Sequence, residues 1–135
     1  MKKVTLAAML AALLFTVPGF AADRPQPAAK LEKLLAGRVA GEPTNCINLL
    51  GNTRSQIIDG HAIVYRVGST LYVNQPRSGA NSLDDDDILV TRTLGNRLCN
   101  VDVVTLVDRT SRIPHGFLIL GDFVPYKKME SLRQQ

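Results

Sequence analysis

Tryptophan is absent from this chain of 135 residues, and four Phe and three Tyr make up an aromatic content of only 5%. Gly and Pro, at 10 and 7 residues, are neither enriched nor periodic, so the chain is not collagen-like or of low complexity. A mean hydropathy of +0.04 excludes a protein with several membrane spans. The sequence also lacks a Gly-x-Ser-x-Gly elbow, a phosphate-binding loop and a dinucleotide fingerprint, so no common catalytic motif suggests an activity.

No uncharged apolar run approaches the ~20 residues that a bilayer-spanning helix needs. The longest run, Val4 to Val17, follows Lys2 and Lys3 and ends at Pro18. Small residues then precede a cleavage point after Ala21 or one residue later, which is the layout of a secretory signal peptide. We therefore expect the mature chain to be periplasmic or secreted, without a stable membrane anchor.

Charge of one sign is in small excess, because 16 Lys and Arg face 12 Asp and Glu for a net charge of +4. Removing the predicted signal peptide takes away Lys2 and Lys3 and leaves 14 basic against 12 acidic residues, a charge of +2. This balance gives no electrostatic basis for binding nucleic acid, so we expect no such partner. About 114 residues remain, enough for one small core.

Only two cysteines occur, Cys46 and Cys99, so the chain has no Cys-x-x-Cys redox pair and no Cys-x-x-Cys-His haem site. An even number of cysteines in an exported chain favours a structural disulfide between them. Free buried thiols, or reactive or metal-binding thiols, are the alternatives, because sequence does not show whether the two sulfur atoms lie within bonding distance.

An amphipathic helix is predicted over residues 28–39, because Leu31, Leu34, Leu35 and Val39 recur at helical spacing. Pro27 suits its first turn. The helix lies in a segment, residues 22–45, that otherwise reads as a linker.

Two tight turns organise the strands that follow Cys46. Asp59-Gly60 lies between apolar runs, a pattern typical of a hairpin, and Gly68-Ser69 is a second turn of this kind. If both loops have two residues, Tyr65 lies opposite Tyr72. Both faces of the second hairpin are then apolar, which predicts a central hairpin covered on both sides. The two predicted faces are Ala62, Val64, Leu71 and Val73, and Ile63, Tyr65, Val67 and Tyr72.

Further strands are predicted over residues 88–93, 101–107 and 117–124, the last bent at Gly121-Asp122 and closed by Pro125, with a loop over 108–115. Short strands with a single helix predict a mainly β fold with a minor α part, an antiparallel meander forming a small barrel or sandwich. The expected organisation is a signal peptide (1–21), a linker with the helix (22–45), a β-rich domain (46–126) and a charged tail (127–135).

Four consecutive carboxylates, Asp84, Asp85, Asp86 and Asp87, are the most unusual local feature. Carboxylate oxygens are calcium ligands, but the run lacks the alternating spacing, central Gly and distal Glu of an EF-hand. We expect a solvated loop, with a cation site and a docking patch for a basic partner as alternatives.

Candidate ligand-binding residues lie in two places. Arg109, Arg112 and His115 share one predicted loop, where we expect arginines to pair with aspartates and fix loops to the sheet; an anion held by the arginine forks is the alternative. Tyr65 and Tyr72 form a predicted cross-strand pair, which suits either the core or stacking on a ligand.

Five segments carry a family resemblance. In chain order they are Cys46-Ile47, Ile57-Ile58-Asp59, Leu71-Tyr72-Val73-Asn74, Leu98-Cys99-Asn100-Val101-Asp102-Val103-Val104 and Gly121-Asp122-Phe123-Val124-Pro125. Their order, across most of residues 46–125, resembles a family of small exported proteins of Gram-negative bacteria known as a domain of unknown function. The resemblance implies an exported β-rich module that contains both cysteines, and it implies no catalytic residue. The family includes lipoproteins, from which this chain departs in having no Cys near the predicted cleavage site.

No nucleophile–base pair or metal constellation is evident in the sequence. We therefore expect a non-catalytic binding or envelope-associated module without a cofactor, whose partner is an envelope protein or a small anionic ligand. One alternative is a small periplasmic enzyme that pairs His115 with a carboxylate from the run Asp84 to Asp87, since such groups assemble across a fold. A Ca²⁺-stabilised accessory protein is the other.

Overall fold

The computed structural model describes residues 26–49, 51 and 53–133, so the predicted signal peptide lies outside the described residues. The elements are α1 Pro27–Leu35, β1 Arg38–Ala40, β2 Cys46–Asn48, β3 Arg54–Ile58, β4 Ala62–Val67, β5 Thr70–Asn74, the 3₁₀ helix η1 Ala80–Ser82, β6 Asp87–Thr91, β7 Arg97–Cys99, β8 Val103–Asp108, β9 Pro114–Ile119, β10 Phe123–Lys128 and α2 Met129–Leu132. No helix in these ranges is long and apolar enough to cross a membrane.

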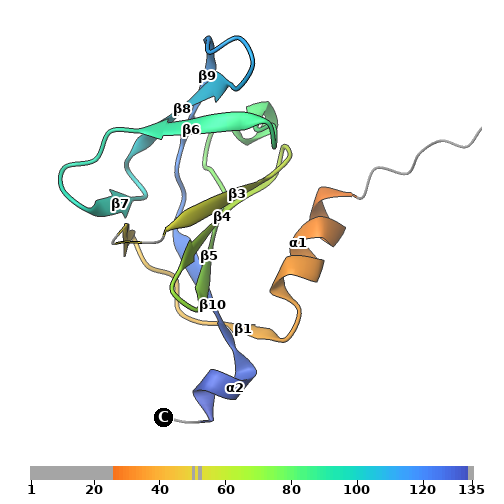
Figure 1. The fold of residues 1–135 in the computed structure, drawn as a ribbon. Helices are drawn as coiled ribbons and strands as arrows, with labels where there is room; N and C mark the ends of the chain where they lie inside the picture. Colours follow the sequence, from red (N-terminus) through yellow and green to blue (C-terminus); the bar gives the residue numbers. More distant parts are fainter. Residues whose placement is uncertain (1–25, 50, 52, 134–135) are drawn as a thin grey trace, which may run out of the picture.

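The strands form three antiparallel sheets, as Figure 1 shows. The largest has the order β1-β10-β5-β4-β3, a second has the order β6-β8-β9, and β2 pairs with β7. Over the described residues these sheets do not close into a barrel, and the arrangement is sandwich-like. The predicted fold class is therefore confirmed, with the sandwich form of the two that the sequence allowed.

The predicted central hairpin is confirmed in register and in burial. Tyr65 pairs with Tyr72 and Val64 with Val73 across β4 and β5. Gly68 has a φ of +59°, a conformation that the tight turn requires and glycine adopts without steric cost. Each predicted face packs into its own hydrophobic cluster, so the hairpin has a core on both sides.

The loop between β3 and β4 differs from the two-residue turn considered in the sequence analysis. Ile58 pairs with Ala62, so the loop holds Asp59, Gly60 and His61. Gly60 has a φ of +61°, and the N–H of His61 donates to the Ile58 carbonyl at 2.9 Å. One additional loop residue shifts the pairing of β3 against β4 by one position. This shift decides which side chains of the two strands lie on the same face of the sheet.

The N-terminal helix is shorter than predicted. It ends at Leu35, and Gly37, with a φ of +72°, turns the chain into β1. Val39 therefore lies on β1, opposite Lys127 of β10, and not on the helix. The three leucines of α1 do pack on the sheet as expected, against the cluster of Ile58, Ala62, Val64, Leu71 and Val73.

The last predicted strand is two strands in different sheets. β9 pairs with β8 in the three-stranded sheet, and β10 pairs with β5 and β1 in the five-stranded sheet. Gly121 lies at the crossover, where a Cβ atom would clash with the Gln75 carbonyl oxygen. Pro125 does not close the strand, because β10 continues to Lys128 and α2 follows it. His115, predicted in a loop, lies on β9.

Candidate functional site

The four consecutive aspartates precede and begin β6, and their side chains interact with different partners. The Oδ1 atom of Asp84 accepts from the Asp86 N–H at 2.9 Å within the turn. Asp85 pairs with Lys30 of α1 at 3.2 Å, and Asp86 pairs with Arg109 Nε at 3.3 Å. Among the described residues, no group of three or more His, Cys, Asp or Glu side chains is arranged to hold a metal ion. The described residues therefore give no support to the calcium alternative.

Asp87, the last of the four, is buried and bonds the histidine that the sequence analysis singled out. Its Oδ1 atom lies 2.6 Å from His115 Nε2, and its side chain is 4% exposed against 39% for His115. The pair borders an open pocket of about 460 Å³ lined by Asp84, Asp86, Asp87, Asp108, Ser111, Ile113 and His115. Thus the structure does bring His115 to the aspartate run, as the enzyme alternative required.

This acidic pocket determines the proton affinity of its histidine. The hydrogen bond to Asp87 raises the pKa of His115, and the negative charges of Asp87, Asp108 and Asp84 raise it further. Hydrogen bonds from Ser111 hold the pKa of Asp108 below its usual range. Among the described residues, no hydroxyl or thiol is hydrogen-bonded to His115. The pair therefore shares a proton between β6 and β9, and the Ser111 hydroxyl, which lines the same pocket, is not bonded to it.

A pH-dependent stability follows from this pair. Because the folded-state pKa of His115 is raised, its contribution to stability is fully present below the ordinary histidine value of 6.5 and is lost as pH rises through the folded-state value. We expect the Tm to fall between pH 5.5 and pH 8.5, and His115→Gln to reduce that fall. Thermal unfolding followed by circular dichroism measures both, with His61→Gln as the matched control. An unchanged pH slope in His115→Gln would show that the pair contributes nothing.

The other candidate ligand-binding residues lie in different surroundings. Arg109 is held by Asp86, and Arg112 is exposed with a φ of +60°. Acidic side chains surround His115, and the ion pair of Arg109 with Asp86 is of the loop-fixing kind that the sequence analysis expected. Tyr65 is 5% exposed and packs edge-on against Phe123 with ring centroids 5.9 Å apart, so it belongs to the core. Tyr72 is partly buried and packs against the same cluster.

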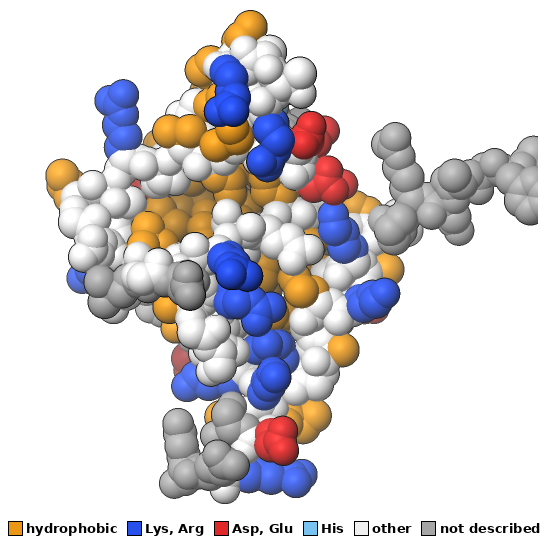
Figure 2. All heavy atoms as spheres, viewed as in Figure 1, with side chains coloured by type: hydrophobic (Ala, Val, Ile, Leu, Met, Phe, Trp, Pro, Cys, Tyr) orange, Lys and Arg blue, Asp and Glu red, His pale blue; other side chains and the backbone are white. Residues whose placement is uncertain are grey.

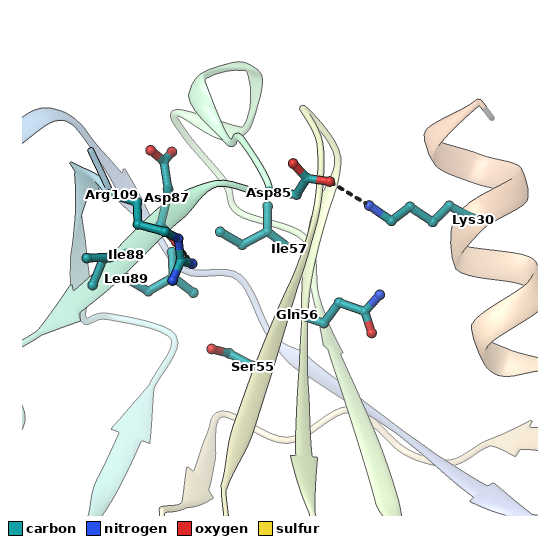
Figure 3. A pocket seen from close by; sticks show the side chains of 9 residues that line it. All are labelled: Lys30, Ser55, Gln56, Ile57, Asp85, Asp87, Ile88, Leu89 and Arg109. Carbon is teal, nitrogen blue, oxygen red and sulfur yellow. Dashed lines mark hydrogen bonds and ion pairs between the residues drawn. The ribbon is translucent and has the colours of Figure 1, made fainter. Parts of the chain in front are cut away.

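A groove that the sequence analysis missed lies between β3 and β6. Figure 3 shows these two strands on its two sides, with the salt bridge between Lys30 and Asp85 at one end. It encloses about 460 Å³. Its lining residues are Lys30, Ser55, Gln56, Ile57, Asp85, Asp87, Ile88, Leu89 and Arg109. On the face shown in Figure 2, a hollow floored by hydrophobic side chains lies between these strands.

The walls of this groove are strand edges. Three consecutive residues of β3 and three of β6 line it, and because successive side chains point to opposite faces, a run of three borders the groove along an edge. Over the described residues, β3 ends the five-stranded sheet and β6 ends the three-stranded sheet. Sequence reasoning missed this groove because β3 and β6 are far apart in the chain. The periodicity of side chains gives no information on how close two such strands lie.

Two buried hydroxyl groups lie near the β3 edge without hydrogen-bond partners among the described residues, those of Thr53 and Tyr65. Tyr65 lies directly opposite Ser55, which lines the groove, so the two side chains share a face of the sheet. Burial raises the pKa of the Tyr65 hydroxyl, which stays protonated. Buried polar groups without partners are uncommon in folded proteins.

Comparison of the sequence and structure with protein-family models, curated proteins and solved structures found no match.

Proposed function

We propose that this chain is an exported, non-catalytic binding module that takes up an extended strand of an envelope protein in the groove between β3 and β6. The pattern of residues 1–21 supports export, and the disulfide between Cys46 and Cys99 is compatible with an oxidising compartment. The observation that carries the binding role is the pair of strand edges that border one groove.

Strand edges present rows of backbone N–H and C=O groups, and an extended peptide adds to such an edge through main-chain hydrogen bonds. Here two edges border the same groove, so one added strand has a possible neighbour on each side. Ile57 and Leu89 pack in the same hydrophobic cluster and line the groove, which gives it an apolar floor for alternate side chains of the peptide. The charged side chains of Lys30 and Arg109 are also among the lining residues.

The enzyme alternative has one supporting observation, the bond between His115 and Asp87. A histidine–carboxylate pair serves catalysis when it activates a nucleophile or moves a proton on a substrate. The present pair joins β6 to β9, and Asp87 Oδ2 also accepts from the Asp84 N–H at 3.3 Å. These contacts favour a structural role, so the binding module is the better supported function.

Peptide selection tests the proposal. A displayed library of nine-residue peptides is selected on the mature, disulfide-bonded protein, and hydrogen exchange is then measured with a selected peptide bound. We expect the selected peptides to alternate apolar and polar residues, and binding to slow exchange at residues 54–58 and 87–91. Protection of other segments, or failure to select any peptide, would contradict strand uptake here.

A matched pair of variants sharpens this test. Ser55→Lys places a charged side chain on the β3 edge, and proteins use such charges to block strand addition. We expect it to weaken binding of the selected peptide about tenfold. Ser69→Lys makes the same change on an exposed residue of the β4–β5 turn and should leave the affinity unchanged. Equal affinities for the two variants would exclude the β3 edge as the binding surface. Thermal unfolding of each variant confirms that it is folded.

A further inference from the structure

Two arginines lie directly opposite each other on β3 and β4, Arg54 and Arg66. Like charges at directly opposed positions destabilise a sheet. Both side chains are exposed, and neither forms an ion pair with an acidic residue of the described chain. The opposed pair thus leaves a local charge uncompensated.

These arginines border a pocket of about 360 Å³ between α1 and the five-stranded sheet. Its apolar walls are Leu34 of α1, Val64 of β4 and Leu71 of β5. Ser55 and Gln56 of β3 complete the lining. A charged end beside aliphatic walls is the arrangement of a site for an amphipathic molecule, and the volume lies in the range of small-ligand pockets.

A third arginine strengthens the positive field. Arg38 of β1 donates through Nη1 to the carbonyls of Ser69 at 2.8 Å and Tyr126 at 3.2 Å, so its guanidinium is held in place. Burial lowers the pKa of Arg38, and the charge of Arg66 lowers it further. Figure 2 shows Lys and Arg side chains in a band over the lower part of this face, where the five-stranded sheet lies. The field near Arg66 therefore favours an anion.

We propose that the pocket of Arg54 and Arg66 binds a single anionic group, a carboxylate or a phosphate, whose apolar chain lies against Leu34, Val64 and Leu71. Guanidinium forks match the oxygen geometry of both anions and bind them with charge-assisted hydrogen bonds. The anion supplies the negative charge that the opposed arginines lack. The pocket shares Ser55 and Gln56 with the β3–β6 groove, but Arg54 and Arg66 do not line that groove, so the anion site does not rest on the proposed peptide-binding role.

Calorimetric titration of the mature, disulfide-bonded protein tests the charge and the chain separately. The probes are octyl phosphate, inorganic phosphate, octanol and octyltrimethylammonium. We expect octyl phosphate to bind most tightly, inorganic phosphate more weakly and the neutral and cationic probes not at all. Equal binding of octanol and octyl phosphate would overturn the role of the arginines, and equal binding of the two phosphates would overturn the role of the apolar walls.

Variants locate the site. Arg54→Gln and Arg66→Gln should each weaken the binding of octyl phosphate about tenfold, which is the effect of losing one charge-assisted hydrogen bond. Arg97→Gln, an exposed arginine on β7, is the matched control and should not change the affinity. If all three variants lose affinity equally, the protein attracts anions only through its net charge and the proposal fails. It fails too if Arg54→Gln and Arg66→Gln bind like the wild type.

Vesicles identify the source of the anion. If the site takes a lipid headgroup, phosphatidylglycerol vesicles should bind the wild type and lose binding with Arg66→Gln, while phosphatidylcholine vesicles should not bind. If the site takes a free amphipathic anion, octyl phosphate binds and neither vesicle does. Vesicle binding that survives both arginine substitutions would contradict a headgroup site in this pocket.

Discussion

Replacing Asn74 by Ala is expected to lower the free energy of unfolding by about 3 to 5 kcal/mol, the largest effect of any single substitution considered. Asn74 is fully buried at the end of β5. Its Nδ2 donates to the Gly121 carbonyl at 2.6 Å, and its Oδ1 accepts from the Gly121 N–H at 3.1 Å. Alanine would leave both backbone groups of buried Gly121 without partners and would open a cavity. Urea unfolding followed by circular dichroism at pH 7 measures the loss.

Asn100→Ala is the matched control for this prediction. The Asn100 amide also makes a short hydrogen bond, to Asp122 at 2.6 Å, but that bond is exposed to water, so its loss should cost no more than about 1 kcal/mol. Gly121→Ala tests the same junction from the other side, because its Cβ would meet the Gln75 carbonyl oxygen, and it should also destabilise strongly. An Asn74→Ala variant no less stable than Asn100→Ala would contradict the assigned role.

The central hairpin was predictable because its information is local. A turn signal with glycine fixed the register of β4 against β5, and alternation then assigned each side chain to a face. That reasoning placed Tyr65 opposite Tyr72 and predicted two covered faces, both of which the structure shows. The fold class followed from the same short strands and turns.

The junction at Gly121 was not predictable, because its cause is distant in sequence. Asn74 and Gly121 lie 47 positions apart, and nothing in either segment indicates that a polar side chain at the end of a strand is buried against the other. A bend with Gly121-Asp122 was expected within one strand, whereas the chain passes from one sheet to the other. The three-residue loop at Gly60 also differs from the expected turn. Because it shifts the register of β3, it places Arg54 opposite Arg66.

The segments on which the family resemblance rests supply contacts of the scaffold. Asp102 accepts from the Cys99 N–H at 2.7 Å and so fixes the chain after β7. Asn74 and Gly121, from two other segments, bond each other. None of the five segments contains an aspartate of the run Asp84 to Asp87 or an arginine of the anion pocket.

Removing the disulfide is expected to cost about 4 kcal/mol, the entropy of closing a loop of this length in the unfolded chain. Cys46 and Cys99 are directly opposed partners in the β2–β7 pair, 53 positions apart in sequence. Each of these strands has only three residues, so the pairing has few hydrogen bonds of its own. Urea unfolding of the Cys46→Ser/Cys99→Ser variant against the oxidised wild type measures the loss.

The reduced wild type provides the control that separates the bond from the substitutions. If loop closure is the cause, reduction should destabilise the wild type by the same amount and should leave the double variant unchanged. A double variant as stable as the oxidised wild type would show that the β2–β7 pair holds without the bond. A loss of about 4 kcal/mol is a large part of the 5–15 kcal/mol that stabilises a typical domain. The expected loss therefore ties the stability of this small core to an oxidising compartment, which is where the proposed export would place the chain.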